Sequence, residues 1–563
     1  MADTHSHSSA EHKNEKEGLD VLAIGDVDSG RSLGYEAPEP SAMTRRAQLL
    51  GIAICTGGFL FGYDIGVVSC AFIMKDFVLR FGGECIDGVC SLPSSRTSLI
   101  NSTLSVGTFV GALLQAPVSD FFGRRTSMVF WASWFLLGAI VQTATISSWQ
   151  QFAVGRAFAG LGVGALSGLC PLYLGETAPK HVRGAMVAGY QLLIIFGIFV
   201  SYGIGWATHT MVDSVASWKI PVGLQLLWGV ILIALMTVLP ESPRWKLQRG
   251  DVVEARRVMA AMRNIELRDF HGELRGDKWM EAELADMNEG ILIENEAFKD
   301  RNYISAYLLC FSNKQQMWKR TLNGIMLQTI QQLNGQNFYY YYGPVFFNSA
   351  AVSLDAYQIQ FLLGSVSLLA TIPALISIEK LGRRQSLLIG AAAEASCAFI
   401  VAFVGRYALA PRGTPPDQIS SSQKQAGNAF ITFAIFHVMF FSIFWGPTPW
   451  VFLSENYPQY IRAKCISLGS AANWIWNFLL SYFSPGIADK YDTFILLIFG
   501  SVLVFGFFYT YFMVPEVKGL TLEQVDELYS QNVAPWRSAS WVPTIGETNR
   551  GSPKKRKNRV ETA

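Results

Sequence analysis

The chain has 563 residues, of which 50% are hydrophobic and only 16% are charged, whereas soluble domains average about 25% charged residues. This composition excludes an ordinary soluble domain, and the formal net charge of +2 excludes a polycationic surface for nucleic acid. The 38 Phe, 20 Tyr and 15 Trp residues favour a protein that meets a lipid bilayer, because aromatic side chains anchor helices at the membrane surface.

Residues 1–44 are rich in His, Ser, Glu and Lys and carry no apolar period, so we expect a disordered cytosolic tail. The last fifty residues lead to the same expectation. No short basic segment, apolar core and cleavage site precede the first apolar run, so we expect no removable signal peptide.

Apolar runs long enough to cross a membrane predict an all-α integral membrane protein. Such a helix needs about 20 mostly apolar residues, because its backbone must satisfy its own hydrogen bonds in hydrocarbon. We count twelve runs, which predict six-helix bundles over 45–239 and 321–513, a cytosolic helical linker over 240–320 and a cytosolic tail over 514–563. The runs are 47–71, 98–118, 127–146, 152–174, 186–207, 220–239, 321–347, 358–378, 386–405, 428–453, 466–486 and 493–513.

The lysine and arginine residues of the loops predict the orientation, because cytosolic loops carry an excess of them. Loops after even-numbered runs hold nine such residues close to helix ends, against about seven after odd-numbered runs, so we expect both termini in the cytosol. Cys85 and Cys90 then lie outside, where a disulfide is stable, and the sequence leaves their pairing open. Asn101 begins a glycosylation motif at the mouth of the second run, where we do not expect modification.

Charged residues at the ends of the runs repeat between the two halves of the chain. Asp120 and Arg124 follow the second run in the order Asp-Phe-Phe-Gly-Arg-Arg. Glu379 and Arg383 follow the eighth run in the order Glu-Lys-Leu-Gly-Arg-Arg. These two motifs are 259 residues apart in the sequence, and two further pairs of motifs are 279 and 275 residues apart. The nearly constant separation predicts a duplicated six-helix unit. The further pairs are Glu176 and Arg183 with Glu455 and Arg462, and Pro240-Glu241 with Pro515-Glu516.

We expect these charged side chains to act as a gate at the cytosolic helix ends. They can bridge the two halves when the inner side is shut and separate when it opens. An exposed pair contributes only about 0.2–1 kcal/mol, which suits a gate that must reopen. The alternative is that they are ordinary loop charges and interfacial anchors.

Eight motifs spread over most of 47–520 resemble the sugar porter family of the major facilitator superfamily, and most closely its fungal hexose transporters. The resemblance implies a plasma-membrane hexose transporter that works by alternating access. Its sugar site would lie between the two halves near mid-membrane and open to each side in turn. Two departures stand out: Ser367 replaces an Asn that many relatives carry, and the final run closes with Pro-Glu-Val-Lys-Gly instead of Pro-Glu-Thr-Lys-Gly. The motifs are F-G-Y-D at 61–64, D-F-F-G-R-R at 120–125, P-L-Y-L-G-E-T-A-P-K-H-V-R-G at 171–184, P-E-S-P-R at 240–244, Q-Q-L-N-G-Q-N at 331–337, E-K-L-G-R-R at 379–384, G-P-T-P-W at 446–450 and N-W at 473–474.

The seventh run carries an unusual number of amide side chains. Desolvating an unpaired polar group costs about 2–7 kcal/mol, so these amides require partners or a wet cavity. A sugar is a neutral polyol and needs groups that both donate and accept hydrogen bonds. The run therefore predicts a sugar site, with hydrogen bonding between helices as the alternative. The amides are Gln328, Gln331, Gln332, Asn334, Gln336 and Asn337.

The resemblance assigns individual roles around this run. Trp450, which the resemblance makes a sugar contact, is alternatively a packing ring. Tyr341 and Tyr342, which it makes occluding residues, are alternatively part of an interfacial belt. A regular helix would place Asn337 and Gln332 on different sides, so a ligand shared by both requires a break in the run. We expect it near Gly335 or before Gly343-Pro344. The implied sugar-binding residues are Gln191, Gln331, Gln332, Asn337, Trp450 and Asn473, and the implied occluding residues are Tyr341 and Tyr342.

Asp64 in the first run and Arg156 in the fourth are predicted to pair inside the membrane. The two runs are antiparallel, and both residues fall at comparable depth in the outer half. A proton that binds when the pair parts and leaves when it re-forms would couple uptake to the proton gradient. Family symporters carry this Asp, but some fungal facilitators retain it without coupling, so a permanent ion pair is the alternative.

We expect no enzymatic activity, metal or cofactor, because the sequence shows no nucleophile elbow, zinc helix or nucleotide motif. The expected partners are a monosaccharide, the lipid bilayer and, for a symporter, protons, and we expect a monomer to suffice. Three alternatives stay open: a uniporter of the same sugars, a pentose, polyol or disaccharide porter, and a non-transporting sugar receptor.

Overall fold

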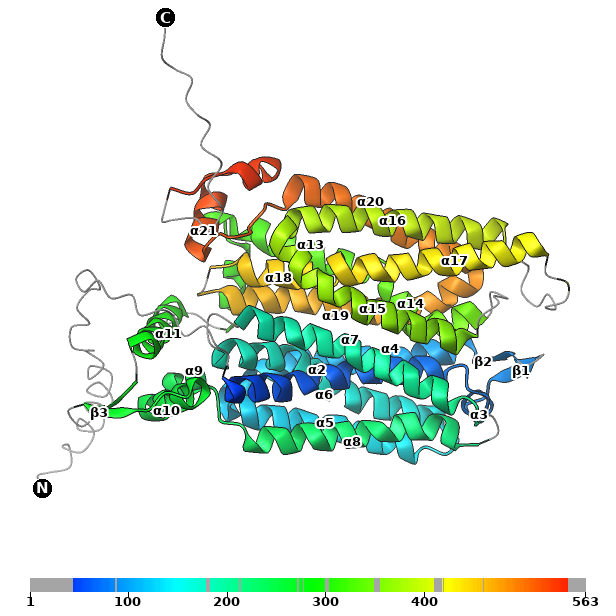
Figure 1. Cartoon of the computed structure of the whole chain (residues 1–563), viewed down its shortest axis with the longest axis horizontal. Helices are drawn as coiled ribbons and strands as arrows, with labels where there is room; N and C mark the ends of the chain where they lie inside the picture. The colour runs from blue at the N-terminus through cyan, green and yellow to red at the C-terminus, as the bar shows by residue number, and fades with distance from the viewer. Residues whose placement is uncertain are drawn as a thin grey trace, which may run out of the picture. The chain divides into compact units, whose positions relative to one another are not determined.

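The computed structural model describes residues 44–86, 89–178, 183–211, 214–270, 273–276, 278–298, 303–348, 355–409, 418, 420–458 and 460–544. They all belong to one compact unit, Met43–Ala563. Most of them are helical, and the long helices run roughly side by side (Figure 1). The expected N-terminal tail lies outside the described residues.

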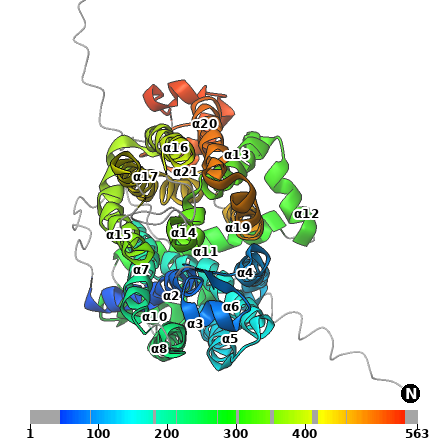
Figure 2. The ribbon, with the colours of Figure 1, turned by 90° about the vertical axis from the view of Figure 1, so that its right-hand side faces the viewer.

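The long helices form two groups that follow the chain order. Viewed along the helices in Figure 2, the first group occupies the lower part and the second group the upper part. The first group comprises α2 (Arg45–Ala71), α4 (Ser94–Phe122), α5 (Arg124–Ala144), α6 (Trp149–Thr177), α7 (Arg183–Thr208) and α8 (Ala216–Val238). The second comprises α13 (Met317–Gln332), α14 (Gln336–Asn348), α15 (Ala356–Leu381), α16 (Arg383–Tyr407), α17 (Ser421–Phe440), the π-helical turn Phe441–Trp445, α18 (Thr448–Glu455), α19 (Arg462–Tyr491), the 3-10 turn Asp492–Phe494 and α20 (Ile495–Met513).

Ten helical stretches of the described residues are long and apolar enough to span a membrane. One of them, Arg462–Met513, is 52 residues long and contains both α19 and α20. The expected seventh run is divided into α13 and α14, which are 16 and 13 residues long. Each is shorter than a membrane span, which needs about 20 residues. The all-helical membrane fold is confirmed, whereas the count of twelve spans remains a prediction.

The seventh run unwinds where the sequence analysis expects it. Helix α13 ends at Gln332, α14 begins at Gln336, and Gly335 between them has φ +97°. That left-handed backbone favours glycine, and a Cβ there would lie 2.8 Å from the ring of Phe499 in α20. Helix α14 then continues through Gly343-Pro344, so of the two expected positions Gly335 is the break.

Short elements gather at the two ends of the long helices (Figure 1). At one end lies α3 (Lys75–Arg80) with the hairpin β1 (Glu84–Ile86) and β2 (Val89–Ser91). The hairpin aligns Cys85 with Cys90, but their side chains lie outside the described residues and their pairing stays open. This hairpin and that of β3 (Arg268–Phe270) with β4 (Glu273–Arg275) were not expected in an all-α protein. Each pairs three residues only, too few to signal a strand.

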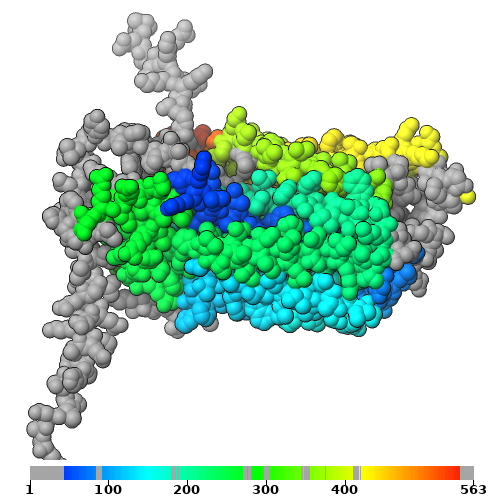
Figure 3. Space-filling view, turned by 60° about the horizontal axis from the view of Figure 1, so that its bottom comes forward, coloured from blue at the N-terminus to red at the C-terminus, as the bar shows by residue number. Residues whose placement is uncertain are grey.

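The linker and the C-terminal segment lie at the other end. Figure 3 shows the linker surface in green beside the start of α2 in blue, where the Thr44 hydroxyl donates to the carbonyl of Met262. The linker contains α9 (Pro243–Gln248), α10 (Val252–Arg263), α11 (Lys278–Phe298), α12 (Tyr303–Leu308) and the 3-10 turns Leu309–Phe311 and Lys314–Gln316.

The expectation of disorder after the last run is wrong for residues 514–544. This segment forms α21 (Leu522–Ser530) and the 3-10 turn Pro535–Ser540. Thr521 and Gln524 form a capping box at the start of α21, a sequence signal that marks a helix. The helix buries Val525 and Leu528, and Arg320 of α13 donates to Asp526 at 2.6 Å. Burial of this apolar face is what orders the segment.

Candidate functional site

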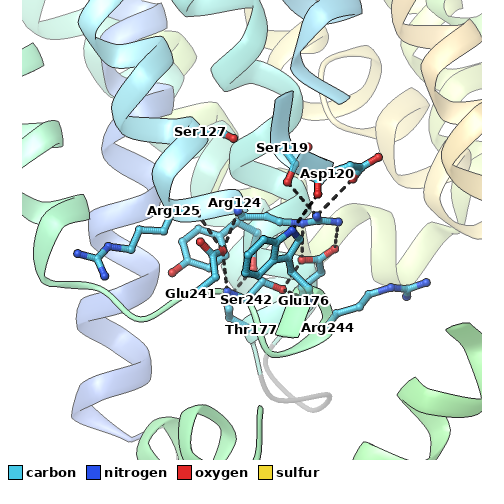
Figure 4. Close-up of polar contacts among 12 residues, drawn as sticks. Ser119, Asp120, Arg124, Arg125, Ser127, Glu176, Thr177, Glu241, Ser242 and Arg244 are labelled. Atoms are coloured by element: carbon cyan, nitrogen blue, oxygen red, sulfur yellow. Dashed lines mark hydrogen bonds and ion pairs between the residues drawn. The ribbon is translucent and has the colours of Figure 1, made fainter. Parts of the chain in front are cut away.

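The first charged network joins α4, α5 and α6 at the end of the bundle near the linker (Figure 4). Arg124 donates from Nε and Nη2 to the two oxygens of Glu176, both at 3.0 Å. Its Nη1 lies 3.3 Å from Asp120, whose side chain is 69% exposed. The Glu241 carboxylate accepts from the backbone N–H groups of Arg124 and Arg125 at 2.7 and 3.1 Å. A two-pronged arginine contact of this kind fixes orientation as well as charge.

The second half repeats this network residue by residue. Arg383 donates to both oxygens of Glu455, at 2.7 and 2.6 Å. Its Nη2 lies 3.1 Å from Glu379, whose side chain is 70% exposed. Glu516 accepts from the backbone N–H groups of Arg383 and Arg384, both at 3.0 Å. The charge repeat in the sequence is therefore a repeat of structure.

The side-chain partners of each arginine lie in its own half, and Glu241 and Glu516 directly follow the last long helix of that half. In this conformation the two networks hold helices together within each half instead of bridging them. Arg462 begins α19, and Arg183 begins α7 with its side chain outside the described residues. The gating role of these charges therefore stays a prediction.

The predicted pair of Asp64 and Arg156 forms. Arg156 Nη1 donates to Asp64 Oδ2 at 2.7 Å, and both side chains are completely buried. Arg156 Nη2 also lies 3.4 Å from Oδ1 of Asn101, and the side-chain amide of Asn101 donates to the Tyr342 hydroxyl at 3.1 Å. These contacts connect the ion pair of the first half to an aromatic residue of the second. Asn101 itself is buried, as expected for an unused glycosylation motif.

Four of the predicted sugar-binding amides come together around the break between α13 and α14. Asn473 of α19 donates to Gln331 at 3.0 Å. Asn337 donates to the side-chain Oε1 of Gln332, so the break does bring these two side chains together. Asn477 donates to the same oxygen at 3.2 Å. The amides thus satisfy one another across three helices, and a sugar would have to replace these bonds with its own hydroxyl groups.

Gln331 also fixes a second irregular segment. Its amide donates to the carbonyls of Trp445 and Gly446 at 3.0 and 2.7 Å. These carbonyls lie between the π-helical turn and α18, where Pro449 lacks the N–H that would bond to Trp445. Inside a membrane such a freed carbonyl needs another donor, and Gln331 supplies it.

The remaining predicted sugar contacts are less enclosed. Gln191 in α7 is half-buried, and Trp450 in α18 is 38% exposed. Across the two halves, Phe61 of α2 packs on Trp474 with ring centroids 5.6 Å apart. The Ser367 hydroxyl lies 2.9 Å from the Tyr340 hydroxyl, so this departure from the family pattern is next to the tyrosine run.

The two halves touch on the side of the break that faces the β1–β2 hairpin. Within the second half, α14 is held to α19, because Tyr342 donates to the Ser481 carbonyl at 2.5 Å and Tyr341 lies 3.0 Å from the Asn477 amide. Two further contacts join α14 and α19 to the first half. Ser105 of α4 donates to Asn477 at 2.8 Å. Tyr202 of α7 donates to the backbone of α14 at 3.1 Å. Both predicted occluding tyrosines are therefore buried in a hydrogen-bonded seam between the halves.

Sequence reasoning missed Asn477, which joins Gln332, Tyr341 and Ser105. A signal was available, because Asn477 follows Asn473 by four residues and so lies on the same helix face. The contact of Asn101 with Tyr342 had no such signal, since it depends on how the two halves pack.

Comparison with known proteins identifies the family. A family model described as "Sugar (and other) transporter" matches residues 50–529. The chain belongs to this family. It is a multi-pass membrane transporter of sugars and not an enzyme.

Relatives and solved structures agree with this assignment. The low-affinity glucose transporter of Kluyveromyces lactis is 37% identical over 493 residues, covering 88% of this chain and 84% of the relative. The galactose transporter of Saccharomyces cerevisiae is 35% identical over 547 residues, covering 97% and 92%. A structure of the xylose transporter XylE from E. coli aligns with a TM-score of 0.66 and 22% identity over 85% of this chain and all of that one. The fold is thus that of the major facilitator superfamily, as the sequence predicts.

Proposed function

We propose that the chain carries a hexose across the plasma membrane by alternating access, coupled to protons. The observation that carries the proposal is the amide cluster at the break between α13 and α14, where Gln331, Gln332, Asn337 and Asn473 meet. Relatives named as glucose and galactose transporters favour a hexose over other sugars. We further propose cytosolic termini and a functional monomer.

The chemistry of the cluster suits a polyol. An amide both donates and accepts hydrogen bonds, so the bonds between Gln332 and Asn337 can be exchanged for bonds to sugar hydroxyls at little net cost. Helices α13, α14 and α19 contribute to the cluster, so a sugar bound there would contact several elements that move with the second half. Trp450 would offer its exposed ring to the C–H face of the sugar.

Proton coupling is supported by the contacts of Asp64. When Asp64 is ionised, it holds Arg156, and Arg156 in turn contacts the Asn101 that binds Tyr342. Protonation of Asp64 removes the attraction that fixes Arg156. The Asn101–Tyr342 contact then loosens, and the seam between the halves opens to the outside. A proton taken up there would be released when the seam re-forms.

Facilitated uniport is the second candidate. The observation in its favour is that the ion pair is complete at 2.7 Å and fully buried, as a permanent structural pair would be. In that case Asp64 and Arg156 only hold α2 against α6, and the sugar moves down its own gradient.

Uptake by cells that lack their own hexose transporters separates these candidates. We expect saturable glucose uptake that galactose competes and a protonophore abolishes. Uptake that a protonophore leaves unchanged would support uniport. Uptake of a pentose, polyol or disaccharide in preference to hexoses would contradict the substrate assignment, and binding without uptake would indicate a receptor.

A further inference from the structure

A second acidic side chain, Glu394, is buried in the middle of α16 in the second half. It is 0% exposed. Its Oε2 accepts a hydrogen bond from the Asn334 amide at 3.2 Å, whereas Oε1 has no hydrogen-bond partner in the part of the chain that the structure describes. Among the ion pairs of the described residues, none includes Glu394, in contrast to the Asp64–Arg156 pair of the first half.

Among the described residues, no lysine or arginine faces Glu394 from the helices packed against it. From α17, His437 points Nδ1 at the Glu394 backbone carbonyl, 3.1 Å away, and its Nε2 has no partner. From α14, the Tyr339 ring packs on His437 with centroids 5.4 Å apart. Cys397 follows on α16 itself. The central turns of α15 and all of α20 carry no charged residue in the sequence.

An isolated carboxylate in such surroundings is unstable relative to the neutral acid. Burial without a partner costs an ionised group far more than a neutral one, so the group binds a proton instead. The neutral carboxyl still accepts the hydrogen bond from Asn334.

Asn334 connects Glu394 to the sugar site. It lies in the turn between α13 and α14, and its side-chain Oδ1 accepts from the backbone N–H of Gln336 at 2.9 Å. One side chain thus ties the start of α14 to α16. The same turn is flanked by Gln332 and Asn337, whose amides form the proposed sugar site.

We propose that Glu394 is a proton-binding site and, in its neutral form, a positioning residue that holds the α13–α14 turn through Asn334. The inference rests on the proposed function, because its main readout is sugar affinity. Loss of the proton would leave a charge in the apolar centre of the second half, draw water or Asn334 toward it and displace the turn.

Sugar exchange in proteoliposomes tests this inference when both sides have the same pH. In the wild type, the KM should rise toward alkaline pH, by up to about tenfold per pH unit above the titration midpoint, because only the neutral fraction binds. Glu394→Gln keeps the hydrogen bond to Asn334 without titrating, so its KM should lack this rise. Asp64 is present in both proteins, and the ratio of their KM values therefore isolates Glu394. A ratio that is constant with pH would overturn the proposal.

Truncation tests the connection through Asn334. Glu394→Ala and Asn334→Ala should each raise the KM by about tenfold at a pH below the wild-type titration midpoint, and the double variant should be no worse than either single one, because both remove one hydrogen bond. Additive losses, or a Glu394→Ala variant that matches the wild type, would contradict the positioning role.

An infrared measurement keeps the proton site testable without transport. Purified wild type at neutral pH should show a protonated-carboxyl band that Glu394→Gln lacks. If wild type and Glu394→Gln show the same protonated-carboxyl band, Glu394 does not bind a proton. This comparison does not require that the variant transports sugar. If the wild type exchanges no hexose at all, the proposed function fails, while the infrared result still decides the fate of the proton site.

Discussion

The two halves of this transporter match at their linker-side ends and differ in their centres. Arg124 and Arg383 make the same contacts to carboxylates and backbone in each half. In the centre, the first half holds the Asp64–Arg156 ion pair, whereas the second holds the amide cluster and an acid, Glu394, without a cation. A duplicated frame thus supports two different chemistries. The residues proposed to bind the sugar and the proton therefore lie where the halves diverge.

The largest expected effect comes from the ion pair of the first half. Asp64→Asn removes the group that binds the proton, so accumulation of a non-metabolised hexose against its gradient should be abolished. Exchange of labelled sugar should persist, because the amide cluster of the second half is intact. Transport into transporter-null cells measures both. Accumulation that survives the substitution would refute the coupling role.

Matched arginine substitutions in the two networks compare how much each network contributes to the stability of the protein. Arg124→Ala leaves Glu176 buried without its partner, and breaking a buried pair costs about 3–5 kcal/mol. Arg383→Ala should cost less, because the Glu455 side chain is 32% exposed whereas that of Glu176 is 6% exposed. Melting of the purified proteins in detergent compares them. An equal or reversed order would show that exposure does not decide the strength of these contacts.

A smaller effect is expected from the amide cluster. Gln332→Ala removes hydrogen bonds worth about 0.5–1.5 kcal/mol each, so the KM for the sugar should rise by about tenfold with little change in surface expression. Gln142→Ala, at a glutamine that is also buried but lies in α5 of the first half, is the control and should leave the KM unchanged. If expression and uptake fall together, Gln332 has a folding role instead.

The smallest effect is expected at the departure from the family pattern. Ser367→Asn places an amide beside Tyr340, and it should shift the preference between hexoses by less than about tenfold. Ser365→Asn is the matched control, since Ser365 bonds to the backbone of its own helix. Competition between labelled and unlabelled sugars measures both variants. An unchanged preference in Ser367→Asn would separate this position from the site.

Much of the fold could be predicted because it depends on local patterns. Most apolar runs coincide with long helices of the structure, and Gly335, where the backbone breaks, was one of the two positions expected from helical geometry and the family resemblance. The partners of the amides could not be predicted, because periodicity fixes the face of a helix and not the residue opposite it. Asn477 and Glu394 were missed for this reason. The ordered C-terminal segment was missed because its capping box and short apolar face were outweighed by its polar composition.

A structure with bound glucose tests the central claim most directly. We predict that the sugar lies at the turn between α13 and α14, that its hydroxyl groups contact Gln332 and Asn337, and that the hydrogen bond between these two side chains is broken. A sugar bound elsewhere, with this amide bond intact, would contradict the account.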